Sequence, residues 1–129
     1  MSETPDLPKP SDGELEILHE LWSRGPLTVR EVHEALSKKQ KMGYTTILKM
    51  MQIMYAKGLV IRDDSSRAHI YEAAIEEEVV QEKMVKKLLD RVFKGSAEQL
   101  ILRALSVKRS TPEELEEIRK ILDSLENDS

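Results

Sequence analysis

Hydrophobic positions along the first half of the chain repeat with a helical spacing. Residues 12–24, 29–39 and 43–57 each place leucine, isoleucine, valine or methionine side chains along one side of a helix. A capping box at 11–14 marks the start of the first helix, and Gly25-Pro26 marks its end. The pattern therefore predicts three short helices joined by tight connections.

The pattern then changes to that of a β-hairpin. Leu59–Arg62 predicts one strand, and Ala68–Tyr71 predicts a returning strand. Between them, residues 63–66 are the Asp and Ser pairs that are typical of a turn. Two antiparallel strands with a short polar connection are therefore expected after the third helix.

Helical spacing resumes at residue 76 and continues almost to the C-terminus. Residues 76–93 carry a wide apolar stripe, a short helix follows Ser96, and Thr111-Pro112 with Glu114 starts a last helix. The order of helices, hairpin and helices predicts a mostly α fold with a small β-hairpin wing. Specifically, it predicts an N-terminal winged helix-turn-helix followed by a C-terminal helical domain.

Composition supports a folded, reduced protein. The chain has 129 residues, of which 40% are hydrophobic and 34% are charged, and it contains no cysteine. Disulfides, thiolate catalysis and thiolate metal sites are therefore excluded. The sequence has no run of 18 apolar residues and no signal peptide at its polar start, so we expect a cytoplasmic protein without membrane insertion.

Positive charge is concentrated in one part of the chain. The net charge is −4, but residues 28–69 carry eight basic and four acidic side chains, and no acidic residue occurs between Lys41 and Arg62. Local charge matters more than net charge for binding a polyanion. A charge run such as Lys38 to Lys41, taken alone, is more often a solvated helix face than a binding surface. Its position in a winged helix-turn-helix order favours double-stranded DNA as the partner.

The third helix and the hairpin carry the candidate DNA contacts. Short polar side chains at Thr45 and Thr46 could approach bases closely, and Lys49 lies on the same polar side of the helix. Arg62 and Arg67 flank the turn of the hairpin, where a wing would meet the DNA backbone. The basic stretch adds Arg30 and Lys41 as further candidates.

Four segments resemble the BlaI/MecI/CopY family of penicillinase and copper-homeostasis repressors. They are Glu14–Trp22, Leu27–Val32, Tyr44–Met50 and Lys57–Val60, and the resemblance extends over roughly residues 10–126. The resemblance implies a homodimer on a palindromic operator. It also implies that the third helix reads the major groove through Tyr44, Thr45, Thr46 and Lys49, with Arg67 in the wing.

The chain departs from this family at both known switches. Penicillinase repressors are cut at an Asn-Phe bond by a membrane sensor-protease, and Arg103-Ala104 stands at the matching position here. Copper repressors bind metal through Cys-x-Cys motifs, which a chain without cysteine lacks. The inducing signal and any sensor or protease partner therefore stay open.

The C-terminal helices are expected to form a homodimer. Their apolar positions are too numerous for one short arm to bury, and two-fold symmetric proteins read palindromes. The alternative is that these helices fold back on the N-terminal domain of their own chain. The candidate dimer contacts are Val80, Met84, Leu88, Val92, Leu100, Ile101, Leu105, Leu115, Ile118 and Leu122.

These observations predict three regions and one function. Residues 1–10 are expected to be a flexible tail, 11–75 the DNA-binding winged helix-turn-helix, and 76–129 the helical dimerisation domain. The predicted function is a sequence-specific transcriptional repressor. The alternatives are an activator or architectural DNA-binding protein, and a winged-helix protein-interaction module that binds no DNA.

An enzyme is not expected, and neither is a cofactor or a metal. The sequence has no glycine-rich phosphate loop, no histidine cluster and no nucleophile-elbow serine. His33 and His69 lack the spacing of a metal pair, and Asp63-Asp64 suits a turn better than a cation site.

Overall fold

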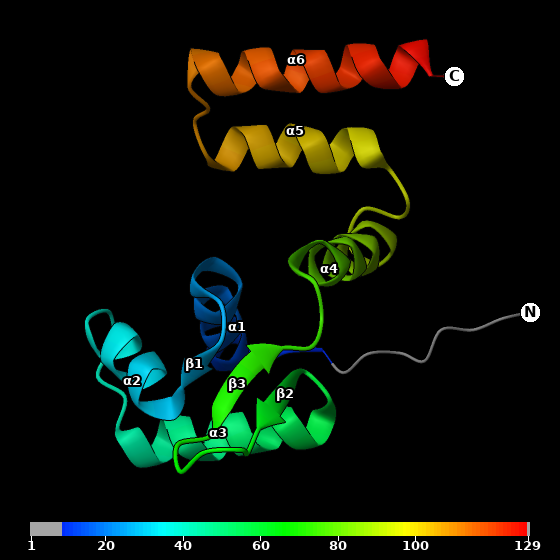
Figure 1. The fold of residues 1–129 in the computed structure, drawn as a ribbon. Helices are drawn as coiled ribbons and strands as arrows, with labels where there is room; N and C mark the ends of the chain where they lie inside the picture. Colours follow the sequence, from blue (N-terminus) through cyan, green and yellow to red (C-terminus); the bar gives the residue numbers. More distant parts are fainter. Residues whose placement is uncertain (1–8, 129) are drawn as a thin grey trace, which may run out of the picture. The chain divides into compact units, whose positions relative to one another are not determined.

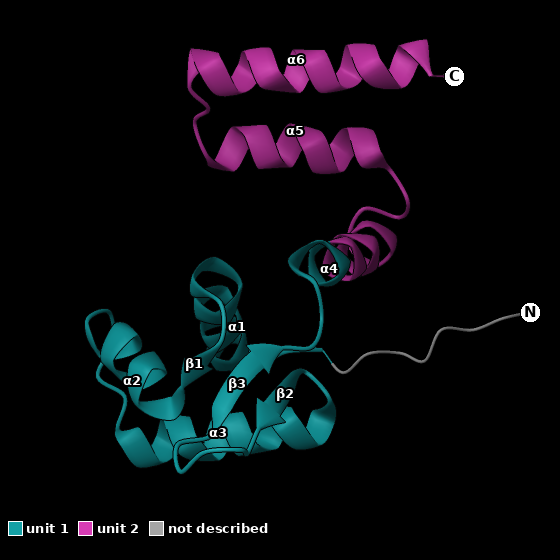
Figure 2. Ribbon diagram, in the orientation of Figure 1, with its two compact units in different colours: residues 1–81 teal, residues 82–129 magenta. Residues whose placement is uncertain are grey.

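A computed structural model describes residues 9–128 (Figure 1). The chain divides into two compact units, which we call unit 1 (residues 1–81) and unit 2 (residues 82–129) (Figure 2). The predicted tail over 1–10 lies mostly outside the described residues, and its last residue, Pro10, is buried. The elements are α1 (Asp12–Arg24), β1 (Leu27–Thr28), α2 (Val29–Ser37), α3 (Tyr44–Lys57), β2 (Val60–Asp63), β3 (Ile70–Ala73), α4 (Glu77–Arg91), α5 (Ala97–Val107) and α6 (Pro112–Asn127).

The first two helices begin where their sequences predict. The Ser11 hydroxyl accepts the N–H of Glu14, whose carboxylate in turn accepts the N–H of Ser11, and Thr28 and Glu31 repeat this arrangement at the start of α2. Hydrogen bonds from the Thr28 N–H and hydroxyl lower the pKa of Glu31. Gly25 ends α1 with a φ of 88°, a conformation that glycine adopts without steric penalty. Both predicted capping boxes are therefore confirmed.

The small sheet has three strands in the order β1-β3-β2, and all neighbours are antiparallel. The hairpin is one or two residues later than predicted, because the Leu59 N–H bonds to the carbonyl of Met54 and so completes the end of α3. The two-residue strand β1 was not predicted. It pairs Leu27 with Tyr71, a partner far away in the sequence.

One hydrophobic core holds unit 1 together. It contains Ile17 and Leu18 of α1, Val32 of α2 and the methionine-rich side of α3, all fully or almost fully buried. Tyr71 of β3 is 1% exposed and closes the core from the sheet. The predicted winged helix-turn-helix, mostly α with a small β wing, is confirmed.

Unit 2 has no comparable core within one chain. Ser96 and Thr111 cap α5 and α6 through their hydroxyl groups, and Pro112 opens α6 as predicted. Yet no residue of α5 or α6 is buried, although both helices carry leucine and isoleucine side chains. Among the described residues, no helix is long and apolar enough to cross a membrane.

Candidate nucleic-acid interface

The helix α3 separates a buried side from an exposed side at its N-terminal end. Ile47, Met51 and Met54 lie in the core of unit 1. The residues predicted to read DNA from this helix are instead at the surface: Tyr44, Thr45, Thr46 and Lys49 are all exposed. One surface of α3 therefore offers hydroxyl, phenol and ammonium groups together.

The N-terminus of α3 has no side-chain cap, unlike those of four other helices of the chain. α1, α2, α5 and α6 each begin with a Ser or Thr hydroxyl that accepts a backbone N–H. Gly43 precedes α3 and supplies no such side chain, and the first turn of α3 has no acidic residue. The first N–H groups of α3, together with the positive end of its dipole, are thus available to a phosphate.

The eight basic residues of 28–69 fall into two groups. Four are paired with carboxylates: Arg30 with Glu34, Lys39 with Glu20, Lys57 with Glu14 and Arg62 with Asp64. The other four have no ion pair within the described residues. They are Lys38 and Lys41 before α3, Lys49 on α3 and Arg67 in the loop between β2 and β3, and all four are exposed.

Arg62 is held within the wing. Its Nε lies 2.7 Å from Oδ1 of Asp64, and its guanidinium carbon lies 4.2 Å from the ring centre of Tyr55 on α3. The hydrogen bond to Asp64, and then that to Tyr71, raise the pKa of Arg62. In this arrangement Arg62 braces the hairpin against α3, and a contact with DNA would require Arg62 to exchange Asp64 for a phosphate.

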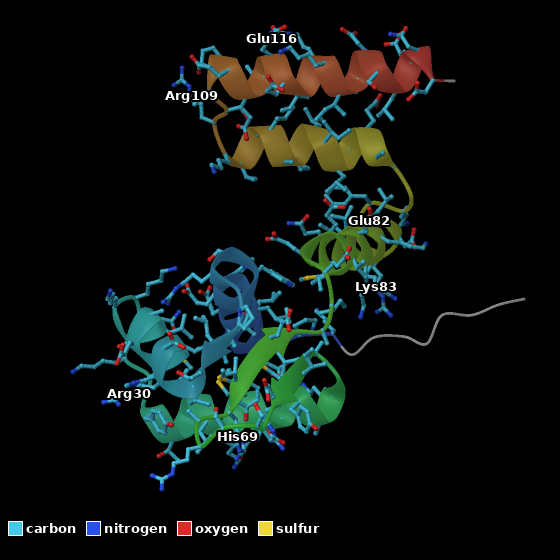
Figure 3. The ribbon with its side chains drawn as sticks, in the orientation of Figure 1. Arg30, His69, Glu82, Lys83, Arg109 and Glu116 are labelled. Carbon is cyan, nitrogen blue, oxygen red and sulfur yellow. The ribbon has the colours of Figure 1, made fainter. Side chains whose placement is uncertain are left out.

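Arg30 and Tyr44 border a shallow depression between α2 and α3. The depression is lined by Arg30, His33, Glu34 and Tyr44. The rings of His33 and Tyr44 meet edge to face with centroids 5.8 Å apart, which orients the phenol at the start of α3. Arg30 lies 3.6 Å from Glu34 on the exposed side of α2. Figure 3 shows Arg30 on α2 and His69 in the hairpin loop.

One residue of this surface was not among the predicted contacts. Lys38 was interpreted as part of a solvated run, but it has no ion pair within the described residues. The uncapped start of α3 is visible in the sequence, because Gly43 stands where α1, α2, α5 and α6 have Ser or Thr. Among residues 9–128, no group of three or more His, Cys, Asp or Glu residues could hold a metal ion.

Nine of the ten predicted dimer residues are exposed or half-buried in the single chain. Leu100, Leu115 and Ile118 are half-buried, and the six exposed residues are Met84, Leu88, Val92, Ile101, Leu105 and Leu122. Val80 differs from the others because it is 4% exposed and lies in the core of unit 1. Its side chain is therefore already covered by its own chain.

The chain is similar to known repressors over most of its length. The model of the penicillinase repressor family matches residues 10–124. The transcriptional regulator BlaI of Mycobacterium tuberculosis strain H37Rv is 36% identical over 118 residues, which cover 88% of this chain and 84% of that protein. This match includes both the winged helix-turn-helix and the C-terminal helices.

Two solved structures resemble unit 1. The DNA-binding domain of the repressor BlaI matches with a TM-score of 0.51 and 28% identity, covering 57% of this chain and 90% of that one. The Bacillus licheniformis BlaI monomeric form in complex with the blaP half-operator matches with a TM-score of 0.50 and 29% identity, covering 57% and 89%. The chain therefore belongs to the penicillinase repressor family, whose members are DNA-binding transcriptional repressors and not enzymes.

Proposed function

We propose that this protein is a sequence-specific transcriptional repressor that binds a palindromic operator as a homodimer. The observation that carries the proposal is the surface around α3. An uncapped helix start, short hydroxyl side chains and the unpaired cations Lys38, Lys41 and Lys49 lie on α3 or just before it, and the unpaired Arg67 lies in the loop between β2 and β3. Such a surface suits the major groove and the phosphates beside it.

Each group on this surface has an expected role. Thr45 and Thr46 would meet base edges, a role that their exposed positions in the first turn of α3 support. Lys41, Lys49 and Arg67 would neutralise phosphates, and Tyr44 would contact the backbone through its phenol. Arg30 and Arg62 stay in the proposed set as residues that would exchange a carboxylate for a phosphate.

The homodimer is proposed from the exposed apolar side chains of unit 2. Leu88 on α4, Val92 directly after α4 and Ile101 on α5 are 43%, 63% and 48% exposed, and apolar side chains exposed in such numbers mark an interaction surface. A second copy of the same helices would cover them, and its two-fold symmetry would match a palindrome. Val80 is left out of this proposed surface because it is buried in unit 1.

The release of the repressor is not assigned to a known switch. Arg103-Ala104 lies in the middle of α5, where both residues are exposed and helical. The pair lacks the Asn-Phe chemistry of the family's cleavage site. A sensor or protease partner would therefore have to recognise another bond or act without cleavage.

A gel shift with the DNA upstream of the protein's own gene tests the proposal. Purified protein is titrated against this DNA with footprinting and a salt series. A protected palindrome that random DNA competes for poorly would support the repressor. Salt-sensitive binding without a footprint would favour an architectural protein, and no binding at low salt would favour a protein-interaction module. Transcription in vitro from a promoter carrying the protected site would distinguish repression from activation.

Replacing Thr46 by alanine should weaken operator binding while sparing non-specific binding. A good base contact contributes about 1–3 kcal/mol of discrimination, so the operator affinity should fall by about 5- to 150-fold. The measurement is a pair of titrations, one with the operator and one with a scrambled duplex of the same length. An equal loss on both duplexes would show that Thr46 does not read bases.

Replacing Lys49 or Arg67 by alanine should weaken binding to every duplex. Each substitution removes one phosphate contact, so the slope of log K against log salt should become less steep by about one. Lys120→Ala is the matched control, because Lys120 is an exposed lysine on α6 that pairs with Glu117. Unchanged slopes for both variants would place the phosphate contacts elsewhere.

A further inference from the structure

The side chain of Trp22 joins α1 to the segment that leads into α4. Its indole Nε1 donates a hydrogen bond of 2.9 Å to the carbonyl of Ile75, two residues before α4 begins. Trp22 is half-buried and packs against the core of unit 1. It lies on neither the reading helix nor the wing, so DNA recognition by unit 1 does not explain this bond.

Neighbouring groups seat the first turn of α4 on the same part of α1. The ring of His19 meets Trp22 edge to face at 5.4 Å, and its Nδ1 lies 3.8 Å from a carboxylate oxygen of Glu77. Ile75 and Val80 are 8% and 4% exposed and belong to the core of unit 1. All of these contacts lie within residues 1–81, so the start of α4 is part of unit 1.

The link between β3 and α4 is short and has few other restraints. The Ala74 N–H bonds to the carbonyl of Leu59, which fixes the end that follows β3. The Ile75 carbonyl is fixed by Trp22, and the Glu76 carbonyl accepts the N–H groups of Val79 and Val80. Without the indole N–H, Ile75 would keep its apolar contacts, but its carbonyl would lose the hydrogen bond that ties this turn to α1.

We propose that Trp22 is a positioning residue that sets the half-site spacing the dimer accepts. The proposal rests on the dimeric repressor proposed above. α4 runs from Glu77 to Arg91, so one helix belongs in part to unit 1 and in part to unit 2. Because α4 also carries the first of the proposed dimer contacts, fixing its first turn would restrict how far apart, and at what rotation, two DNA-binding units can be held.

The test compares operators of different spacing, using the full-length chain. The probes are the operator found by footprinting, the same site with two base pairs inserted at its centre, and a single half-site. Two base pairs turn one half-site by about 70° and move it by about 7 Å. A rigidly held pair of units cannot follow this change, so the wild-type protein should lose about 100-fold in affinity on the inserted operator.

Trp22→Phe keeps an aromatic ring but removes the N–H donor. We expect it to bind the half-site as the wild type does, and to lose less than about 10-fold on the inserted operator. Binding to the natural operator should weaken by about 3- to 10-fold, since a freer link has to be ordered on binding. An unchanged half-site affinity would show that unit 1 is intact. If Trp22 were needed only for the stability of unit 1, half-site binding would weaken and the spacing preference would stay.

A second variant keeps the proposal testable if Trp22→Phe does not fold. Inserting three glycines after Gln81 leaves the Trp22 bond and Val80 in place but breaks α4 beyond unit 1. It should accept both spacings with similar affinity. The proposal is overturned if the glycine-insertion variant discriminates between the two spacings as strongly as the wild type. The same result with a folded Trp22→Phe protein would also overturn it. If the wild type itself shows no two-fold operator, the dimeric repressor fails, which is a different result.

Discussion

The double substitution Leu88→Asp and Leu105→Asp should turn the protein into a monomer and lower its operator affinity by about 10²- to 10⁴-fold. Both side chains are apolar and partly exposed in the single chain, at 43% and 38%. In a dimer they would be covered by the partner, and two buried carboxylates without cations would oppose association strongly. Neither residue belongs to the core of unit 1, so DNA-binding side chains should stay in place.

The size of the effect comes from the way in which two linked units bind two half-sites. Once one unit is bound, the second faces its half-site at an effective concentration in the millimolar range. A monomer loses this advantage and binds each half-site separately. The two substitutions leave the core of unit 1 untouched, so a monomer of this chain is expected to keep its half-site affinity.

Sedimentation and two titrations check this expectation. The double variant should sediment as a monomer, lose affinity for the whole operator and bind a half-site like the wild type. Val107→Asp is the matched control, because Val107 lies at the end of α5, is 83% exposed and is not among the proposed dimer contacts. A double variant that stays dimeric at micromolar concentration would place the dimer contacts on another surface.

The fold was largely predictable because its boundaries are local. Capping boxes, the Gly25-Pro26 stop and the Thr111-Pro112 start are written in consecutive residues, and each acts over one helical turn. β1 was missed because two residues carry no periodicity, and its strand character comes from pairing with β3. The hairpin was placed too early because hydrogen bonding at the end of α3 includes Leu59.

The sequence could predict which residues of the candidate site are exposed, but not which of its cations are paired with carboxylates. Alternation of buried and polar positions on α3 is a local property, so Thr45, Thr46 and Lys49 could be assigned to the exposed side. Which cations are already neutralised depends on contacts across the fold. Lys57 meets Glu14 from the other end of unit 1's sequence, and Lys39 meets Glu20. Val80 likewise has the spacing of its neighbours on α4, and only the packing of unit 1 distinguishes it.

The ion pair between Glu14 and Lys57 should be the most important polar contact for the stability of unit 1. Glu14 is 4% exposed and also closes the capping box of α1, while Lys57 lies in the last turn of α3. The two Lys57–Glu14 oxygen distances are 3.1 and 3.0 Å. Lys57→Met removes the cation and keeps the apolar stem, so it leaves a buried carboxylate with Ser11 as its remaining partner.

We expect Lys57→Met to lower the free energy of unfolding at neutral pH by about 2–4 kcal/mol. Removing one partner of a buried pair costs about 3–5 kcal/mol, and the partial exposure of Lys57 reduces this figure. Lys120→Met, which breaks the exposed pair with Glu117 on α6, is the matched control and should change stability by less than about 1 kcal/mol. Urea unfolding of both variants gives the comparison.

The pH dependence distinguishes a charge effect from a packing effect. Burial is the largest single influence on the pKa of Glu14 and raises it, but the Ser11 N–H, the Lys57 ammonium and the Ser11 hydroxyl together bring the pKa below its ordinary value of 4.5. A lowered pKa contributes stability that is present above pH 4.5 and is lost as the pH falls through the folded-state pKa.

Without Lys57, burial acts against fewer opposing contacts, so the pKa of Glu14 should rise and its carboxylate should become destabilising as the pH increases. The stability difference between the wild type and Lys57→Met should therefore be largest near pH 7 and shrink as the pH falls through the lowered pKa of Glu14 in the wild type, below which the carboxyl is protonated in both proteins. A difference that stays constant from pH 7 to pH 3 would instead assign the loss to the packing of the lysine stem between α1 and α3.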